Sequence, residues 1–358
     1  MKILPFINKL LIHLKKPHDI TKFNNLLVVS NTGLGDTLLS TPAIKSLRKS
    51  FPEQKIIFLV NKKMSTLFDK YQYVDKIILY SNGFLNLIRL VYKLRKLRID
   101  TIFLFHSNGP QDVFFSILSG APNILKMTHD KNHEFKSIFY NQPVDKIKHD
   151  IECKLDLIRI FKPTHIDTRM SFSNKNPTEE IVFPKNKKII GLQIGAQDLY
   201  KIWPIKNFIN LSNKLFQNND IHIVIFGHTS YEQKIVKTYM KEFQNVSDKI
   251  TNLCAKTTLE ELCDAIKKID ILISNDTGTM HLAFASKIPT VCLFSPTDSK
   301  IFGPYQDLDK HIVIQKDGNF INNKPKKYRN QDAMELITVE EVYENTLIQL
   351  TRINKCAK

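Results

Sequence analysis

Short runs of continuous apolar residues alternate along the chain with longer segments in which apolar residues recur at helical spacing. In the first half, the runs that predict strands are Leu26–Ser30, Lys55–Val60, Lys76–Tyr80 and Thr101–Phe105. The segments that predict helices there are Thr37–Ser50, Phe84–Arg98, Gln111–Ser119 and Ile151–Phe161. Because the strand runs are apolar throughout rather than at every second position, they predict strands buried on both faces, as in a parallel sheet.

The alternation lapses between Pro163 and Lys188, where polar residues and prolines mark a linker. It then restarts, with predicted strands at Ile189–Ile194, Ile221–Phe226, Ile269–Ser274 and Thr290–Phe294. The predicted helices of this half are Lys206–Gln217, Tyr231–Lys241, Leu259–Lys267 and Val339–Leu350. Two such series around a linker predict an α/β fold of two doubly wound, Rossmann-like domains that face each other across a cleft.

The length of 358 residues also favours two domains over a single core. We divide the chain into an N-terminal extension (1–22), a first domain (23–165), a linker (166–187), a second domain (188–336) and a C-terminal helix (337–358).

The N-terminal extension has the pattern of a basic amphipathic helix. Its apolar face holds Ile3, Leu4, Phe6, Ile7, Leu10, Leu11 and Leu14, and Lys2, Lys9 and Lys16 lie opposite. No small-residue cleavage site follows, so a signal peptide is not expected, and no run reaches the roughly 18 apolar residues of a membrane span. Such a helix either lies in the interface of an anionic membrane or packs on the protein's own surface.

The net charge of +17, from 52 Lys and Arg against 35 Asp and Glu, favours polyanionic partners. AT-rich coding alone is an alternative source of the lysine content. The lysines are scattered and no arginine-rich or aromatic-interleaved block occurs, so nucleic acid is not the expected partner. Among the cysteines there is no metal-ligand spacing, and Cys254, Cys263 and Cys292 read as buried thiols of a protein in a reducing cytoplasm.

The turn Asp276-Thr277-Gly278 follows the third predicted strand of the second domain. A helix predicted to begin near Thr279 would leave backbone N–H groups unpaired and present the positive end of its dipole, which favours phosphate. His281 on the first turn would add a donor. The alternative is an ordinary strand–turn–helix in which Asp276 caps the helix.

A second glycine-containing turn follows the first predicted strand of the chain. Gly33 and Gly35 allow the backbone to turn tightly, but the sequence is neither a dinucleotide fingerprint nor a Walker loop. Asp36 lies at the carboxyl end of the strand, where open α/β sheets bind ligands, so it can act as a general base. The alternative is that Asp36 is only a helix N-cap.

Three further loops of the second domain carry polar groups at strand ends. Lys201 offers a cation for a phosphate, with Trp203 as the anchor of its loop; the alternative is a surface lysine beside a packing tryptophan. Glu232 could accept hydrogen bonds from ribose hydroxyls, or be a solvated glutamate at a helix start. Ser295 and Thr297 offer donors beside the same anion site.

Together the loops of the second domain supply what a nucleotide diphosphate requires: a cation, helix starts and a carboxylate. Asp36 of the first domain would lie opposite, which suggests transfer of the group attached to that diphosphate. No serine or cysteine nucleophile arrangement and no metal cluster is visible in the sequence.

These motifs resemble those of bacterial glycosyltransferase family nine, the lipopolysaccharide heptosyltransferases. The motifs that carry the resemblance, in order across residues 26 to 350, are Gly33–Ala43 (GLGDTLLSTPA), Gly195-Ala196 with Lys201–Pro204 (KIWP), Asp276–Gly278 (DTG) with His281–Ala285 (HLAFA), and Phe294–Thr297 (FSPT).

The resemblance implies a GT-B fold, with a nucleotide-sugar donor, ADP-heptose, bound by residues 188–336. It implies an acceptor on residues 23–165 and a last helix, 337–358, that crosses back to the first domain. The implied reaction is an inverting transfer without a catalytic metal or other cofactor to phosphorylated lipid A or core oligosaccharide. It implies a peripheral protein of the anionic cytoplasmic face of the bacterial inner membrane.

The resemblance also assigns roles to single residues. Asp36 matches the base, and Gly33, Gly35 and Thr37 match its acceptor-side loop. The positions that match donor and phosphate contacts are Lys201, Gln197, Asp276, Thr277, Gly278, Thr279, His281 and Ser295, and Glu232 matches the ribose-binding glutamate. Because a diphosphate would repel a carboxylate, we expect Asp276 to face the sugar hydroxyls or to cap the helix.

The chain departs from the family pattern at three places. Ser30-Asn31 stands where many members carry Arg-Thr or Arg-Ser, Gln197 stands where some carry a hydroxyl, and the extension before Leu26 is longer than usual. The rival functions are transfer of another nucleotide sugar or to a protein or oligosaccharide, and a basic nucleic-acid-binding protein. A nucleotide-sugar epimerase would need catalytic carboxylates and a histidine in an arrangement that the sequence does not show.

Overall fold

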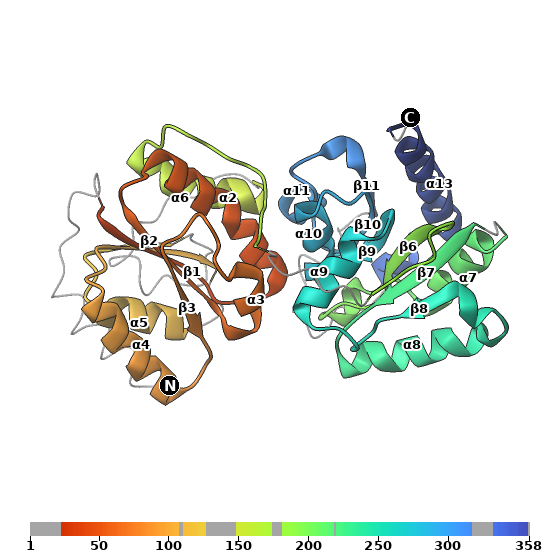
Figure 1. Cartoon of the computed structure of the whole chain (residues 1–358), viewed down its shortest axis with the longest axis horizontal. Coiled ribbons are helices and arrows are strands. Elements are labelled where there is room, and N and C mark those ends of the chain that lie inside the picture. The colour runs from red at the N-terminus through yellow and green to blue at the C-terminus, as the bar shows by residue number, and fades with distance from the viewer. Residues whose placement is uncertain are drawn as a thin grey trace. The chain divides into compact units, whose positions relative to one another are not determined.

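The computed structural model describes residues 23–106, 110–126, 148–173, 181–217, 220–316 and 332–356. The predicted extension, 1–22, lies outside the described residues. The chain divides into a first unit, Met1–Ser173, and a second unit, Asn174–Lys358 (Figure 1).

The first unit is built on a parallel sheet of five strands in the order β3-β2-β1-β4-β5. Its strands are β1 Asn25–Ser30, β2 Lys55–Asn61, β3 Lys76–Tyr80, β4 Thr101–His106 and β5 Asn123–Lys126. The sequence predicts the first four because their apolar runs are buried on both faces. It misses β5, which has only four residues with a polar residue at each end.

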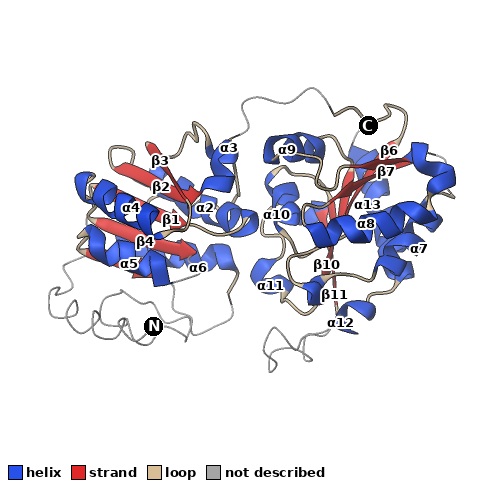
Figure 2. Ribbon diagram, turned by 90° about the horizontal axis from the view of Figure 1, so that it is seen from below, coloured by secondary structure: helices blue, strands red, loops and turns tan. Residues whose placement is uncertain are grey.

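Helices cover both faces of this sheet (Figures 1 and 2). Its longer helices are α2 Leu34–Ser50, α4 Phe84–Lys96, α5 Pro110–Ser119 and α6 Asp150–Ile158, with short turns at Lys62–Met64, α3 Ser65–Phe68 and Arg159–Phe161. α2 packs beside α6, and α4 packs beside α5. Leu90 and Leu94 of α4 join the core cluster formed by the strands.

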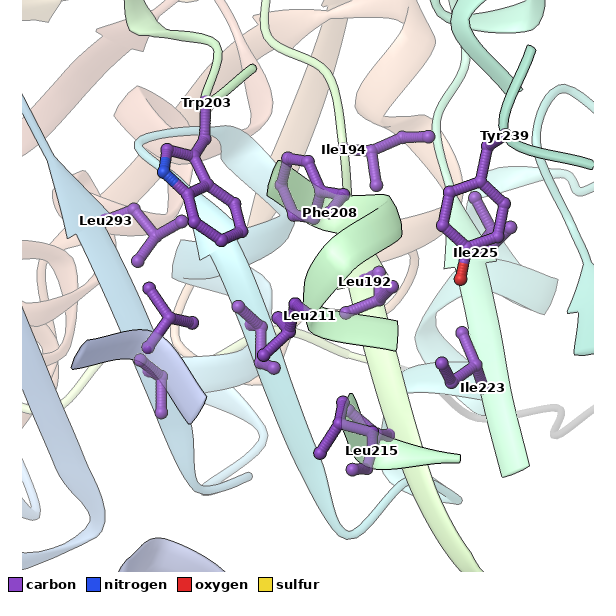
Figure 3. Close-up of a cluster of buried hydrophobic side chains, with 14 of the residues drawn as sticks. Leu192, Ile194, Trp203, Phe208, Leu211, Leu215, Ile223, Ile225, Tyr239 and Leu293 are labelled. Atoms are coloured by element: carbon purple, nitrogen blue, oxygen red, sulfur yellow. The ribbon is translucent and has the colours of Figure 1, made fainter. Parts of the chain in front are cut away.

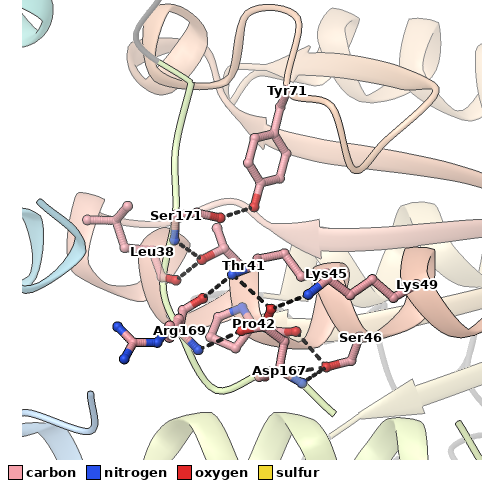
Figure 4. Close-up of polar contacts among 10 residues, drawn as sticks. All are labelled: Leu38, Thr41, Pro42, Lys45, Ser46, Lys49, Tyr71, Asp167, Arg169 and Ser171. Atoms are coloured by element: carbon pink, nitrogen blue, oxygen red, sulfur yellow. Dashed lines mark hydrogen bonds and ion pairs between the residues drawn. The ribbon is translucent and has the colours of Figure 1, made fainter. Parts of the chain in front are cut away.

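The chain after α6 runs back along α2 as an extended strap (Figure 4). The backbone N–H of Asp167 donates to Ser46 Oγ at 2.8 Å, and that of Ser171 donates to Thr41 Oγ1 at 3.0 Å. The carboxylate of Asp167 also lies 3.1 Å from Lys45 Nζ and 2.9 Å from Lys49 Nζ. This part of the predicted linker 166–187 is therefore bound to the helix that follows β1.

The second unit is built on a parallel sheet of six strands in the order β11-β10-β9-β6-β7-β8. Its strands are β6 Lys188–Gln193, β7 Ile221–Phe226, β8 Ile250–Asn252, β9 Ile271–Asn275, β10 Thr290–Phe294 and β11 His311–Gln315. The short edge strands β8 and β11 are not predicted from the sequence, because an edge strand has a weaker requirement for continuous apolar residues.

The helices of the second unit follow its strands in turn. They are α7 Ile205–Leu215, α8 Ser230–Glu242, α9 Leu259–Lys267, α10 Gly278–Ala285, α11 Ser299–Phe302, α12 Asp332–Glu335 and α13 Val339–Cys356, with 3₁₀ turns at Leu199–Lys201, Gln244–Lys249 and Leu308–Lys310. α13 packs on α7 and on strands of its own sheet. Its crossing to the first domain stays a prediction. No described helix is long and apolar enough to cross a membrane.

Trp203 lies in the core on one face of this sheet (Figure 3). Its side chain is fully buried, and its ring packs against the ring of Phe208 at a centroid distance of 4.8 Å. Its indole Nε1 donates to the carbonyl oxygen of Ile337 at 2.8 Å, so the polar atom of the ring is satisfied. The predicted anchoring role of Trp203 is confirmed.

Both sheets have a topological switch point. From β1 the chain proceeds outward through β2 and β3, and then returns to place β4 and β5 on the other side of β1. In the second sheet the same reversal falls between β6 and β9. The predicted fold of two doubly wound parallel sheets is confirmed. Ligands of such sheets bind at the carboxyl ends of the strands that flank the switch point, here β1 with β4 and β6 with β9.

Candidate active site

The switch point of the first sheet brings Asp36 and His106 together. Asp36 lies in the first turn of α2, directly after β1, and His106 is the last residue of β4. Their side chains are 30% and 28% exposed, and Asp36 Oδ2 lies 3.3 Å from His106 Nε2. The pair thus combines a carboxylate and an imidazole that are open to solvent and can exchange protons.

The alternative that Asp36 is a helix N-cap is wrong. The N-cap of α2 is Gly33, and it makes no side-chain capping bond. Thr37 Oγ1 donates back to the carbonyl oxygen of Gly33 at 2.8 Å, which fixes the turn, and Ser40 Oγ donates to the carbonyl oxygen of Asp36 at 2.9 Å. These hydrogen bonds hold the backbone around Asp36, and the carboxylate of Asp36 does not cap the helix.

Sequence reasoning missed His106, because the apolar run that predicts β4 ends at Phe105. The available signal was its position directly after the predicted strand Thr101–Phe105; in the structure His106 ends β4, which pairs with β1. A buried ion pair lies near His106. Lys154 is fully buried and binds Asp150. Burial alone would raise the pKa of Asp150, but Lys154 and the nearby His106 hold it below its ordinary value.

A second carboxyl group lies close to the loop that carries Asp36. Asp112, in the first turn of α5, is 3% exposed. Burial raises its pKa to about 6, although a hydrogen bond from Asn31 and the charge of Lys126 lower it in part. Burial likewise lowers the pKa of Lys126, at the end of β5. Asn31, a position where the chain departs from the family pattern, is thus tied to a buried carboxyl group.

We expect Asp112→Asn to stabilise the protein at high pH. A folded pKa raised from 3.8 to about 6 means that the stability contributed by protonated Asp112 is complete below pH 4 and is lost as the pH rises through 6. Because the substituted amide does not ionise, the variant should gain up to about 3 kcal/mol over the native protein at pH 8 and only about 1 kcal/mol at pH 4.5. Urea unfolding at the two pH values measures this, with the exposed Asp69→Asn as control. An equal effect at both pH values would contradict it.

The switch point of the second sheet brings together Lys201, from the loop after β6, and Asp276, which follows β9. Lys201 Nζ lies 2.7 Å from Asp276 Oδ2, and their side chains are 19% and 7% exposed. Thr297, after β10, donates its hydroxyl to the same carboxylate oxygen at 2.8 Å. The loops after β6, β9 and β10 therefore meet at one edge of the sheet, as predicted. The alternative that Lys201 is a surface lysine is wrong.

The helix start at this edge is not capped by a side chain. α10 begins at Gly278, with Thr277 as an N-cap that makes no side-chain capping bond. The carboxylate of Asp276 is engaged by Lys201 and Thr297, so the alternative that Asp276 caps the helix is not supported. Among the described residues, no side chain accepts a hydrogen bond from the first amides of α10, which is the condition for binding an anion.

Glu232 is buried rather than solvated, being 4% exposed, so the alternative of a solvated helix-start glutamate is wrong. Its Oε2 accepts the backbone N–H groups of His228 at 2.8 Å and Thr229 at 2.7 Å. Its Oε1 accepts Gln193 Nε2 at 2.9 Å. Together with Thr229 it forms a capping box at the start of α8. The sequence analysis missed this network, although Thr229 and Glu232 have the spacing of a capping box.

Two glycines make room for Glu232. A Cβ at Gly195 would lie 2.1 Å from the Cγ of Glu232 and 2.2 Å from its Oε1. A Cβ at Gly227 would lie 2.9 Å from Cys254 Sγ and 3.2 Å from the Cβ of Glu232. Gly195 and Gly227 follow the ends of β6 and β7, which are neighbours in the sheet. The glutamate thus fits because a glycine follows each of these strands.

We expect Gly195→Ala to destabilise the second unit by roughly 2–4 kcal/mol, since the added methyl group must displace Glu232 and its hydrogen bonds. Thermal unfolding measures the loss. The matched control is Gly33→Ala, where the nearest atom to the added Cβ would be Asp36 Oδ2 at 3.8 Å, an ordinary contact. An unchanged melting temperature for Gly195→Ala would show that Glu232 moves freely.

The other predicted donor residues lie at the same edge of the second sheet but differ in exposure. Gln197 is exposed, and Thr277 and Thr279 are half-buried. His281, in the first turns of α10, is 4% exposed and its ring packs edge-on to that of Phe284 at 5.7 Å. Ser295 is 1% exposed, and its Oγ has no hydrogen-bond partner among the described residues.

The predicted buried thiols are confirmed for Cys254, Cys263 and Cys292, and Cys153 is also free and buried. Burial raises the pKa of Cys263 and of Cys292 to about 12, so these thiols are poor nucleophiles. In the described parts of the chain, no group of three or more His, Cys, Asp or Glu side chains is arranged to hold a metal ion.

The chain is similar in sequence to proteins of one family. The model of glycosyltransferase family 9 (heptosyltransferase) matches residues 115–332. Lipooligosaccharide heptosyltransferase 2 of Campylobacter jejuni is 29% identical over 285 residues, which cover 79% of this chain and 84% of that protein.

Two solved structures share the fold. Glycosyl transferase family 9 from Veillonella parvula matches with a TM-score of 0.75 at 20% identity, over 93% of this chain and 98% of that one. ADP-heptose LPS heptosyltransferase II of E. coli matches with a TM-score of 0.74 at 18% identity, over 92% of this chain and 99% of that one. The GT-B class predicted from the sequence is confirmed by these matches.

Proposed function

The chain belongs to glycosyltransferase family 9, and from this premise we propose that it transfers heptose from ADP-heptose to the inner core of lipopolysaccharide or lipooligosaccharide. The observation that carries the proposal is the group at the switch point of the second sheet. There Lys201 is held by Asp276 beside the uncapped start of α10. The names of the similar proteins, an ADP-heptose heptosyltransferase and a lipooligosaccharide heptosyltransferase, support the choice of sugar and acceptor.

In the proposed reaction, the acceptor hydroxyl oxygen attacks the anomeric carbon of heptose as the bond from that carbon to the diphosphate oxygen breaks. Asp36 accepts the hydroxyl proton, and ADP leaves with the electron pair of the broken bond, so the anomeric configuration inverts. The charge that develops on ADP is stabilised by Lys201 and by the amides of Thr277 and Gly278.

His106 is proposed as the positioning residue for Asp36. With a proton on Nε2, its imidazole donates toward Asp36 Oδ2 across the 3.3 Å that separate them. That contact would restrict rotation of the carboxylate and leave Oδ1 directed at the acceptor hydroxyl. Asp150 and Lys154 contribute to the electrostatic surroundings of His106 from α6.

Glu232 remains the proposed ribose contact. A carboxylate has about four lone-pair directions, and the network described above uses three of them, so Oε1 keeps capacity for one hydroxyl donor. The backbone and Gln193 donors would then fix the carboxylate before the nucleotide arrives. Gln197, Thr279, His281 and Ser295 are proposed to complete the donor site around the diphosphate and sugar.

The acceptor is proposed to be phosphorylated lipid A carrying inner-core sugars, bound by the first unit at the cytoplasmic face of the inner membrane. A net charge of +17 favours both a phosphorylated acceptor and an anionic membrane surface. The extension 1–22 has a basic, amphipathic sequence and is proposed to contribute to membrane attachment.

Incubation of the protein with ADP-heptose and a series of truncated lipopolysaccharides, with the products read by mass spectrometry, tests this function. We expect one heptose to be added to one truncation in the series and ADP to be released in equal amount. Transfer from another nucleotide sugar, or to a protein, would replace the proposed donor or acceptor. Absence of transfer with every pair would overturn the proposal.

A further inference from the structure

Helix α4 exposes large apolar side chains that its packing does not use. Leu90 and Leu94 are 4% and 0% exposed and join the core of the first unit, with Leu87 and Val91 partly buried against it. The exposed apolar residues of the same helix are Phe84 (76%), Leu85 (65%), Ile88 (52%) and Tyr92 (61%). Single exposed apolar residues are ordinary, but four on one helix form a patch.

The exposed residues of this patch lie together on the helix surface. Phe84, Ile88 and Tyr92 are spaced four residues apart and therefore follow one stripe, with Leu85 at its edge. This second apolar stripe lies beside the buried one. The apolar part of the α4 surface is therefore much wider than its packing on the sheet requires.

The charged residues of α4 are all basic. Its sequence, FLNLIRLVYKLRK, contains no Asp or Glu. The cations that border the exposed stripe are Arg89, Lys93, Arg95 and Lys96, and Lys96 Nζ lies 4.5 Å from the ring centroid of Tyr92. An exposed apolar stripe with aromatic residues and a cationic border is the pattern of a helix that lies in the interface of an anionic membrane.

We propose that α4 docks the first unit on an anionic lipid surface through Phe84, Leu85, Ile88 and Tyr92. Charge selects this occupant over the others. A second copy would bring an identical cationic helix against this one, and the predicted extension 1–22 is itself basic, so both would be repelled. Phospholipid headgroups of negative charge complement the border, and the acyl region accepts the four apolar side chains.

The position of α4 also relates this surface to the candidate active site. Because α4 follows β3 in a parallel sheet, its first residue, Phe84, lies toward the carboxyl edge of the sheet, and Asp36 lies at that same edge. If the proposed function holds, docking through the start of α4 brings this edge to the level of the headgroups, where a lipid-linked acceptor presents its sugars.

Sedimentation of the full chain with vesicles tests the surface. We expect binding to phosphatidylcholine vesicles that contain phosphatidylglycerol and little binding to pure phosphatidylcholine. The double variant Phe84→Glu/Ile88→Glu should lower the bound fraction about tenfold or more. The double variant Arg89→Gln/Lys93→Gln should lower it roughly tenfold, and high salt should cause the same loss in the native protein. The matched control is Leu308→Glu, at a 65% exposed leucine of the second unit, which should bind like the native protein.

The proposal would be overturned if Phe84→Glu/Ile88→Glu bound vesicles as well as the native protein does. It would also be overturned if the native protein were a dimer that this variant converts to a monomer without any loss of vesicle binding. Circular dichroism and melting temperature establish that each variant is folded. The vesicle measurement contains neither donor nor acceptor, so it is independent of the proposed transfer. Conversely, heptose transfer to a water-soluble core oligosaccharide should be unchanged in the variant. If neither the native protein nor any variant transferred heptose, the proposed function alone would be overturned.

Discussion

Asp36→Asn is expected to lower kcat for heptose transfer by about 10²–10⁴-fold, the contribution typical of a general base. The amide keeps the shape of the carboxylate but cannot accept the proton of the acceptor hydroxyl. Because Asp36 is proposed to act on the acceptor, the affinity for ADP should stay within about twofold. Transfer assays and calorimetry with ADP measure the two quantities, and Asp69→Asn, at an exposed carboxylate of the same unit, is the control.

His106→Gln separates proton acceptance from positioning at the same site. This variant keeps the Asp36 carboxylate and removes the imidazole, so we expect a smaller loss of kcat, roughly tenfold, and a changed dependence of kcat on pH. If Asp36→Asn retained turnover comparable to the native protein, Asp36 would not be the base. If His106→Gln left the pH profile unchanged, His106 would have only a structural role.

Lys201→Ala should weaken ADP binding by about 10–100-fold and lower kcat/KM by about 10²–10³-fold, because the ammonium is proposed to contact the diphosphate in both the bound and the reacting state. In the described structure Asp276 occupies one donor of Lys201 Nζ, which leaves two for phosphate oxygens. Calorimetry with ADP and steady-state kinetics measure the losses. Lys206→Ala, at an exposed lysine of α7, removes the same charge away from the site and should change neither.

Asp276→Asn completes the comparison. It keeps the charge of Lys201 but removes its partner, so we expect an intermediate loss, and the double variant should lose less than the sum of the single losses because the two side chains act as one unit. Additive losses would mean that Asp276 contacts the sugar independently. Native affinity for ADP in Lys201→Ala would refute the phosphate role.

The extent of the fold that could be predicted follows from burial. Strands covered on both faces, such as β1 and β7, require mostly apolar residues, and their bounds in the structure differ from the predicted ones by at most one residue. The short strands β5, β8 and β11 carry no comparable pattern, because each has at most three consecutive apolar residues. Neighbouring strands determine their pairing, and sequence alone does not show those neighbours.

The candidate site could be predicted where a polar residue lies in the loop that follows a buried strand. Parallel topology brings such residues to one edge, which is why Lys201 and Asp276 meet. What the sequence could not show is the partner of each group. The contact between Asp36 and His106 depends on β4 pairing with β1, and the burial of Asp112 depends on how α5 packs. Both are properties of the tertiary structure.

Gly195, Gly227 and Glu232 have a consequence for how this protein can change during evolution or engineering. Since the carboxylate occupies the space that a Cβ at Gly195 would need, a side chain at position 195 is tolerated only together with a shorter residue at position 232. Positions 195 and 232 should therefore covary among relatives. A redesign toward another nucleotide would begin at the exposed Gln197, because its substitution leaves the packing between Gly195 and Glu232 unchanged.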